Sequence, residues 1–475
     1  MDYLNNLNDQ QKIAVTTFGK PILIFAGAGS GKTRVLTHKI AYLVDKMGMP
    51  PENILAVTFT NKAASEMKNR VENLIKDYDV EKINIGTFHS ICALFLRKNI
   101  YLLDYKPGFT IYDQSDSTKL VKNVINELDL DPKQYNHKNI AYLISSLKNK
   151  MIFPNEYERI TSEYREIKIA KIYEEYQKSL KNNNAVDFDD LLLLPLEIFK
   201  AFPEKLNEYQ EKYQYVLVDE YQDTNKPQFN FIYSITKNHG EICVVGDDDQ
   251  SIYGWRGADI QNILDFEKSF KNASIVKLEQ NYRSTSNILN AAHSVVSKNL
   301  NRADKKIWTE NNSGDLIKVV ECKDEHNESF QLLKNLRSIK DKSSGRFSDF
   351  AILYRTNSQS RIIEDVLRRN AVPYVIVGGV KFYDRKEIKD VVAYLRLLVN
   401  DSDLISFERV VNFPPRGIGK TSLKKIIDHI QKTSVGVNDL YDKMENLKIG
   451  KKQQDSLRNF LDILKNARNN ISNSQ

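Results

Sequence analysis

Residues 22–33 read Ile-Leu-Ile-Phe-Ala-Gly-Ala-Gly-Ser-Gly-Lys-Thr, an apolar run that passes directly into a glycine-rich stretch. The run predicts a buried strand, and the stretch matches a relaxed phosphate-binding loop, with Ala26 at the first glycine position. Glycines let backbone N–H groups turn toward phosphate oxygens, and the N-terminus of the following helix adds partial positive charge. Lys32 can then reach the β- and γ-phosphates, and the Thr33 hydroxyl can hold Mg²⁺. A flexible glycine turn is the alternative, but the preceding strand favours a nucleoside triphosphate site.

Further apolar segments follow the same pattern, each with a turn and then a helical periodicity. They span residues 22–25, 54–59, 83–87, 215–218 and 242–245. Alternation of strands with helices predicts an α/β fold, in which a parallel sheet carries helices on both faces. Residues from about 90 to 210 are polar with helical spacing, which predicts a helical insertion into this first α/β domain.

The second half of the chain predicts another α/β segment and then helices. That segment begins near Ile275 and includes the strand-like residues 350–354 and 374–377. We therefore expect a nucleotide-binding domain with its insert at residues 1–276. The start of a second α/β domain follows at 277–379, and a helical insert of that domain at 380–475.

A chain of 475 residues with 41% hydrophobic and 28% charged residues is typical of a globular protein with several domains. No apolar run is long enough to span a bilayer, and the N-terminus lacks a signal-peptide pattern. Cys92, Cys243 and Cys322 have no paired spacing for zinc or a disulfide. These features predict a cytoplasmic protein with reduced cysteines and no membrane partner. The net charge of +7 permits a polyanionic partner without requiring one.

Two carboxylates, Asp219 and Glu220, follow the predicted strand 215–218. Because ligands bind at the carboxyl edge of open α/β sheets, Asp219 is placed to hold Mg²⁺ and Glu220 to activate a water. The next strand leads to Gln250, whose amide can donate to a γ-phosphate and accept from that water. The aspartates at 247–249 suggest a metal cluster or a solvated loop, and we favour the loop. Upstream, the amide of Gln11 can pair with an adenine edge.

Together these motifs resemble the UvrD/PcrA/Rep-type superfamily 1 DNA helicases, in order and at similar spacing over nearly the whole chain. Besides Gln11 and the phosphate loop, the matching stretches are residues 58–64 (TFTNKAA), 86–90 (GTFHS), 218–223 (VDEYQD), 246–257 (GDDDQSIYGWRG), 278–284 (LEQNYRS), 354–357 (YRTN), 359–361 (QSR) and 416–419 (RGIG). The resemblance implies a P-loop NTPase with RecA-like motor domains that carry helical insertions. It also implies ATP and Mg²⁺ as substrate and cofactor.

The resemblance also implies a role for each matched residue. Nucleotide contacts are implied for Gln11, Ala26, Gly27, Ala28, Gly29, Ser30, Gly31, Lys32, Thr33, Arg34 and Tyr282, and metal contacts for Thr33 and Asp219. Catalytic roles are implied for Lys32, Asp219, Glu220, Gln250 and Arg283, with Arg283 reaching the γ-phosphate from the second α/β domain. Nucleic-acid contacts are implied for Phe59, Asn61, His89, Tyr253, Trp255, Arg256, Arg355, Asn357, Gly417 and Gly419.

Some of these roles have a structural alternative. Tyr253 and Trp255 could be a core-packing pair, although their glycine neighbours and charged flanks favour stacking on bases. His89 could be an ordinary structural histidine. The acidic run at 187–190 is typical of a helix N-terminus rather than of a metal site.

As a function, the resemblance implies an ATP-driven motor that moves 3′ to 5′ along single-stranded DNA and opens duplexes at single/double-strand junctions. DNA repair or replication is the implied setting, with repair or replication proteins as compatible partners. Three alternatives stay open: a translocase that does not unwind, a non-catalytic ATP-dependent strand-binding protein, and RNA in place of DNA.

The chain departs from the family in one respect. The family's chains continue past this one, and two late motifs (Thr-x-His-x-Ala-Lys-Gly and Ala-x-Thr-Arg) have no match between residues 284 and 475. We therefore expect a truncated chain with an incomplete second motor domain and exposed strand edges. ATP binding should survive and hydrolysis should be impaired. A fragment, half of a split enzyme and a degraded gene product are all compatible with this expectation.

Overall fold

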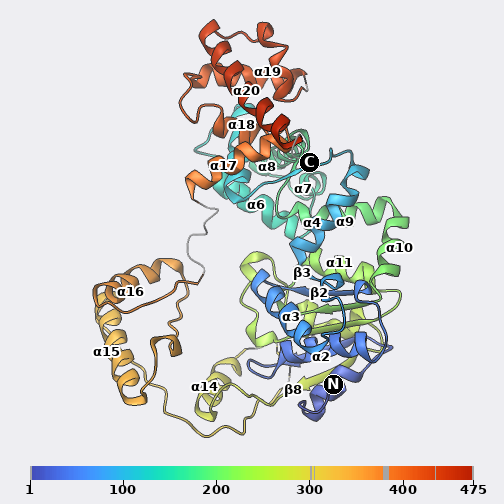
Figure 1. The fold of residues 1–475 in the computed structure, drawn as a ribbon, viewed down its shortest axis with the longest axis vertical. Helices are drawn as coiled ribbons and strands as arrows, with labels where there is room; N and C mark the ends of the chain where they lie inside the picture. Colours follow the sequence, from blue (N-terminus) through green and yellow to red (C-terminus); the bar gives the residue numbers. More distant parts are fainter. Residues whose placement is uncertain (1–2, 300–301, 304, 378–384, 434, 473–475) are drawn as a thin grey trace. The chain divides into compact units, whose positions relative to one another are not determined.

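The computed structural model describes residues 3–299, 302–303, 305–377, 385–433 and 435–472. The chain divides into two compact units, one of Met1–Gly314 with Ala393–Gln475 and one of Asp315–Val392 (Figure 1). Each unit has its own core, and the units are described separately.

The larger unit contains a six-stranded parallel sheet in the order β3-β2-β6-β7-β1-β8. Its strands are β1 (Ile22–Ala26), β2 (Ile54–Thr58), β3 (Asn84–Thr87), β6 (Tyr215–Val218), β7 (Ile242–Gly246) and β8 (Ser274–Leu278). The α/β fold class and the strands predicted in residues 22–245 are confirmed. The strand near Ile275 was wrongly assigned to a second domain, because β8 pairs with β1 along its whole length.

Helices cover both faces of this sheet, which is why its central strands are continuous apolar runs. Along β1, Ile22 and Ile24 face one core while Leu23 and Phe25 face the other, as the pleat requires. The helices of this part are α1 (Asp9–Thr16), α2 (Lys32–Asp45), α3 (Asn61–Leu74), α4 (Phe88–Asn99), α9 (Asp190–Ala201), α10 (Pro203–Lys212), α11 (Lys226–Thr236), α12 (Gln261–Leu264), α13 (Phe266–Ser269) and α14 (Ser286–Val296).

The helical insert is shorter than predicted. A separate core is formed by α5 (Gln114–Glu127), α6 (His137–Asn149), α7 (Pro154–Ile160) and α8 (Tyr164–Asn182), next to the short strands β4 (Thr110–Ile111) and β5 (Ala185–Val186). In contrast, α4 and α9 place their apolar side chains in the core beneath the sheet. The insert therefore lies between β4 and β5, and the flanking helices of the predicted 90–210 segment belong to the sheet domain.

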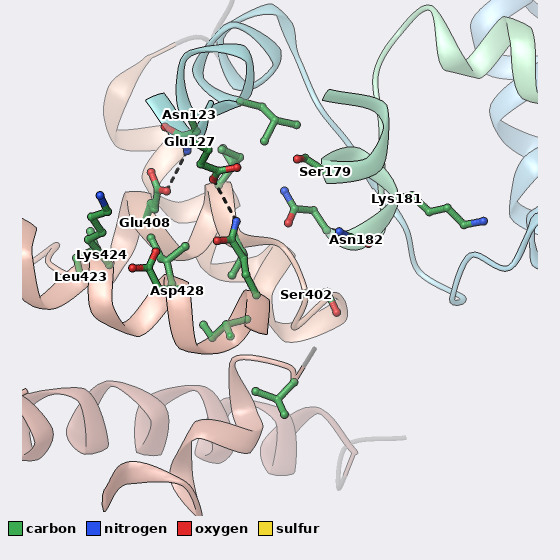
Figure 2. Close-up of a pocket in the computed structure, with 18 of the residues that line it drawn as sticks. Asn123, Glu127, Ser179, Lys181, Asn182, Ser402, Glu408, Leu423, Lys424 and Asp428 are labelled. Atoms are coloured by element: carbon green, nitrogen blue, oxygen red, sulfur yellow. Dashed lines mark hydrogen bonds between the residues drawn. The ribbon is translucent and has the colours of Figure 1, made fainter. Parts of the chain in front are cut away.

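The C-terminal helices of the same unit pack around a further core. They are the end of α17 (Lys386–Val399), α18 (Leu404–Val410), α19 (Lys420–Thr433) and α20 (Lys451–Ser472). A cavity of about 800 Å³ lies between α19 and the insert helices α5 and α8 (Figure 2). Asn123 donates to Glu408 at 3.1 Å, and Gln431 donates to Glu127 at 3.2 Å. None of the residues that line this cavity belongs to the motifs.

The unit Asp315–Val392 contains α15 (Glu325–Ser343) and α16 (Asn357–Arg369), packed through Leu333, Val366 and Leu367. The strands predicted at 350–354 and 374–377 are wrong, because neither segment is a strand among the described residues. Several of their apolar side chains are exposed: Leu353 is 92% and Val375 89% accessible, although Ile352 packs against the core of this unit. A strand needs a hydrogen-bonded neighbour, and within the described part of this unit no second strand supplies one.

Across the part of the chain that the structure describes, no helix is long and apolar enough to cross a membrane. Cys92 and Cys243 are buried and Cys322 is partly exposed, and all three carry free thiols, as predicted.

A buried ion group joins the insert to the sheet domain. The Lys148 ammonium, on α6, donates to the carboxylates of Asp187 at 2.6 Å and Asp190 at 2.7 Å. Asp187 also accepts from the backbone N–H of Asp190, where α9 begins. The prediction of a helix N-terminus at 187–190 is therefore confirmed, and the same acids neutralise a fully buried lysine.

We expect Lys148→Met to destabilise the larger unit by about 3–5 kcal/mol, because it leaves two buried carboxylates without their cation. Urea unfolding followed by circular dichroism measures the change. Lys150→Met, at an exposed position two residues away, is the matched control and should be neutral. Adding Asp187→Asn and Asp190→Asn to Lys148→Met should recover part of the lost stability. A single variant Lys148→Met that is as stable as the parent would contradict the argument.

Candidate active site and strand-binding surface

The predicted nucleotide motifs meet at one edge of the sheet. Strands β6, β7 and β1 are neighbours, and each ends in a motif: Asp219 and Glu220 after β6, Asp247 after β7, and the phosphate loop after β1. Parallel strands place their carboxyl ends together, so residues far apart in sequence share one site.

The phosphate loop has the backbone that its glycines allow. Gly29 and Gly31 have φ values of +71° and +89°, and α2 begins at Lys32 directly after them. The backbone N–H of Tyr282 donates to the Gly29 carbonyl at 3.0 Å, and a Cβ on Gly29 would lie 2.6 Å from that of Arg283. Arg283 therefore belongs to the larger unit beside the phosphate loop. The segment that carries it follows β8, the strand that pairs with β1.

Lys32 and Glu220 form the central ion pair of the site, with Nζ 2.8 Å from Oε2. Glu220 has a left-handed backbone, with φ of +51°, which is rare for a residue with a Cβ and costs about 1–3 kcal/mol. Burial, and then the charge of Glu220, raise the pKa of Asp219 to about 6. The same two causes raise the pKa of Asp223 to about 6. The carboxylates of Asp219, Glu220 and Asp223 thus have too little positive charge around them to balance their own.

The other end of the loop is built from Gln11 and Tyr282. The Gln11 amide donates to the Ser30 carbonyl at 3.1 Å, and its oxygen accepts from the Asn8 N–H. The Tyr282 hydroxyl accepts from the Asn8 amide at 2.8 Å and lies on the same side. Arg34 is exposed on α2. Gln11 and Tyr282 thus lie together beside the phosphate loop, as an adenine pocket requires.

The aspartates at 247–249 are not a solvated loop, so the favoured interpretation was wrong. The buried Lys305 ammonium contacts all three carboxylates, at 2.5 Å for Asp248 and 2.9 Å for Asp249. Arg302 adds an ion pair to Asp249 at 3.0 Å. Asp247 also accepts from the side chain of Gln250. The loop is held as a buried ion network in which Gln250 is already oriented.

The predicted stacking residues form a cluster on two loops. Phe59, which follows β2, lies 4.8 Å from Tyr253 between ring centroids, and Tyr253 lies 6.4 Å from Trp255. The Arg256 guanidinium lies 4.6 Å from the Trp255 ring. Trp255 is 54% exposed, which excludes the core-packing interpretation. Exposed rings beside a cation are the components of a single-strand stacking surface.

Sequence reasoning missed one exposed aromatic residue that contacts a predicted nucleic-acid residue, His89. Phe188 is 51% exposed and its ring lies edge-on to His89, with centroids 5.7 Å apart. Burial lowers the pKa of His89, so its ring is neutral at pH 7. The only sequence signal was an apolar residue within the acidic run 187–190, which was interpreted as a helix start.

The remaining predicted contacts lie in three places. Asn61 is exposed at the start of α3. Arg355 and Asn357 lie in the unit Asp315–Val392, at the start of α16. Gly417, with φ of +75°, and Gly419 form the turn before α19, where a Cβ on either glycine would meet nothing within 4 Å. The structure thus brings the predicted nucleotide residues together at the sheet edge, and it brings Phe59, Tyr253 and Trp255 together in one cluster. The other predicted nucleic-acid contacts do not join that cluster.

Residues 7–271 match the family of the UvrD/REP helicase N-terminal domain, and residues 276–471 match the UvrD-like helicase C-terminal domain. This chain belongs to the UvrD-like helicases. The prediction of a truncated chain is not borne out by these matches, because the C-terminal-domain family covers the second half.

Proteins named ATP-dependent DNA helicase PcrA are similar to this UvrD-like chain over nearly all of its length. The protein of Staphylococcus epidermidis RP62A is 44% identical over 464 residues, which is 98% of this chain and 63% of the relative. The Bacillus subtilis 168 protein is 44% identical over 474 residues, 99% of this chain and 64% of the relative. The Staphylococcus aureus Mu50 protein is 44% identical over 462 residues, which is 97% of this chain and 63% of the relative. The chain spans under two thirds of the length of these relatives.

We expect Lys305→Met to destabilise the larger unit by about 3–5 kcal/mol, because three carboxylates lose their shared cation. Burial alone would raise the pKa of Asp249, but hydrogen bonds from Arg302 and Lys305 lower it. The stability that Asp249 contributes is therefore complete above its unfolded pKa of about 3.9 and is lost as the pH falls below it.

The difference between parent and Lys305→Met should accordingly shrink as the pH falls from about 8 to about 4, because buried carboxylates that have lost their cation take up protons more readily than those of the parent. Urea midpoints across this range measure it. Lys306→Met, at the exposed neighbouring position, is the control. A difference that grows as the pH falls would contradict the ion network.

Proposed function

We propose that this chain binds ATP and couples its hydrolysis to 3′-to-5′ movement along single-stranded DNA, as a helicase motor. The observation that carries the proposal is the juxtaposition at the sheet edge. The Lys32–Glu220 pair lies at one strand end, and the loop that holds Gln250, Tyr253 and Trp255 leaves the adjacent strand. The PcrA relatives, named ATP-dependent DNA helicases, support the same function.

The nucleotide end of the proposal rests on groups that suit a magnesium nucleotide. The backbone N–H groups of the phosphate loop and Lys32 bind the phosphates, while Gln11 and Tyr282 hold the adenine. Asp219 and Thr33 offer a carboxylate and a hydroxyl oxygen, the hard ligands that Mg²⁺ prefers. The raised pKa of Asp219 fits this role, since a buried carboxylate short of positive charge gains from a cation. When bound, Mg²⁺ neutralises charge on the phosphates.

Hydrolysis requires a base, a sensor and a cation around the γ-phosphate. Glu220 orients and deprotonates the attacking water, and Gln250 contacts both the water and the phosphate. Arg283, whose Cβ adjoins Gly29, stabilises the charge that develops on the transferred group. Glu220 must exchange its Lys32 partner for the water, because Lys32 turns to the phosphates when the nucleotide binds.

The strand end of the proposal rests on stacking and on cations. Bases stack on Phe59, Tyr253 and Trp255, and Arg256 binds the backbone, with Asn61, His89, Arg355 and Asn357 as further contacts. The turn with Gly417 and Gly419 contacts the duplex at a single/double-strand junction. Such contacts recognise single strands without reading sequence, which suits a motor in DNA repair or replication.

A second function is a strand-binding protein that binds ATP but does not turn it over. The exposed apolar segments around Leu353 and Val375 favour it, because a motor needs a well-packed second domain to complete its cleft. ATP turnover separates the two functions.

We expect single-stranded oligo-dT to stimulate ATP turnover by the 475-residue chain, measured as phosphate release. Glu220→Gln should lower the stimulated rate by about 100-fold or more, since it removes the general base while keeping the shape of the side chain. Glu208→Gln, at an exposed position on α10, is the control. Turnover no higher than that of Glu220→Gln, with ATP still bound, would contradict the motor function and favour the strand-binding protein.

Trp255→Ala should weaken oligo-dT binding by about 5- to 150-fold, the equivalent of about 1–3 kcal/mol of stacking on one base. ATP affinity should stay unchanged, and strand-stimulated turnover should fall. Trp308→Phe leaves Trp255 as the sole tryptophan, so quenching of its fluorescence by oligo-dT measures the contact directly. Unchanged fluorescence in Trp308→Phe, or full stimulation in Trp255→Ala, would contradict the stacking role.

A further inference from the structure

Gln222 lies between the two halves of the proposed site and belongs to neither. It follows Glu220 in the 3₁₀ turn Tyr221–Asp223, and its side chain is only 1% exposed. Its amide nitrogen donates to Glu220 Oε2 at 3.0 Å, the same oxygen that accepts from Lys32. The amide oxygen accepts from the backbone N–H of Asp247, at the end of β7, at 3.0 Å.

The space around this amide is closed. A Cβ on Gly246 would lie 2.6 Å from the Gln222 side-chain oxygen, so the backbone of β7 approaches as closely as a glycine allows. The amide nitrogen also lies 3.3 Å from a carboxylate oxygen of Asp223. A side chain with a donor on one arm and an acceptor on the other fits this position, and the amide of Gln222 offers both without a charge.

The loop that carries the aromatic cluster is fastened to the same turn. Ser251 donates to the Gln222 carbonyl at 3.3 Å, and the N–H of Asp259 donates to the Thr224 carbonyl at 3.0 Å. Asp247, whose N–H Gln222 receives, in turn accepts from Gln250. Hydrogen bonds therefore connect the aromatic loop to the Gln222 amide through the backbone of Asp247.

We propose that Gln222 is a positioning residue that orients the Glu220 carboxylate and transmits strand binding at the Tyr253–Trp255 loop to it. The inference rests on the proposed function, in which Glu220 is the base. When Lys32 leaves Glu220 for the phosphates, the Gln222 amide remains as the hydrogen-bond donor to Glu220 and keeps its carboxylate oriented toward the water. A shift of Asp247 then tilts the amide and with it the carboxylate.

Two substitutions separate the two arms of the amide. Gln222→Met has a similar length and removes both hydrogen bonds. Gln222→Glu keeps an oxygen that accepts from Asp247 but puts a carboxylate against Glu220. Gln228→Met is the matched control, because Gln228 is also buried and bonds only within the cap of α11.

We expect both Gln222 variants to lower strand-stimulated kcat by about 10-fold or more, with the KM for ATP and the Kd for oligo-dT within about 2-fold of the parent. The Gln228 variant should keep the kcat of the parent. A Gln222→Glu variant with normal kcat beside an impaired Gln222→Met would overturn the inference, since holding the loop would then suffice. Raised KM with normal kcat would overturn it too.

A second measurement needs no turnover. The Kd for a non-hydrolysable fluorescent ATP analogue is determined with and without saturating oligo-dT. For the parent, saturating oligo-dT should change the Kd for the ATP analogue. For Gln222→Met, oligo-dT should change this Kd much less or not at all. A parent that binds no analogue overturns the proposed function itself. A parent that binds it without responding to oligo-dT, or a Gln222→Met that responds fully, overturns the inference alone.

Discussion

The site depends on the parallel pairing of β6, β7 and β1. These strands are buried on both faces, so polar side chains can be accommodated only where the strands end. The parallel direction puts all three ends at the same edge, and the register fixes their relative heights: Ile22 opposes Cys243, and Leu217 opposes Cys243 on its other side. A shift of one residue in any strand would turn its apolar side chains to the other face, so the core itself keeps the motif residues at the strand ends aligned.

The acids at this edge fall into two groups with different charge balance. Asp247, Asp248 and Asp249 share Lys305 and Arg302, and this arrangement is complete as it stands. Asp219, Glu220 and Asp223 have only Lys32 close to them among the described cations, and the pKa values of Asp219 and Asp223 rise to about 6. Such a group is stabilised by added positive charge. The first group therefore supports the loop, and the second fits the magnesium-binding role that we propose for Asp219.

The sequence predicted the parts of the fold that have local signals. Apolar runs and glycines gave β1 and the phosphate loop, and the motif residues led to the sheet edge and the aromatic cluster. Lys305 was missed because an ion pair across more than fifty residues leaves no local pattern. The insert was drawn too wide because α4 and α9 have the same periodicity whether they pack on the sheet or on the insert. Residues 350–354 have strand-like composition, but composition cannot supply the neighbouring strand that a sheet requires.

Energy scales bear on the proposed coupling between the aromatic loop and Glu220. The left-handed backbone of Glu220 costs about 1–3 kcal/mol, and its position is retained through contacts with Lys32 and Gln222. Stacking of a single base on an exposed ring contributes about 1–3 kcal/mol. The two energies are of similar size, which is compatible with the proposed coupling between the strand at Trp255 and the orientation of Glu220. In the proposed coupling, a Glu220 backbone with much less strain would not change its orientation when a strand binds. A Glu220 backbone with much more strain would not keep the observed conformation in the absence of a strand. The strain at this residue is thus of the same magnitude as the stacking energy on which the proposed coupling would depend.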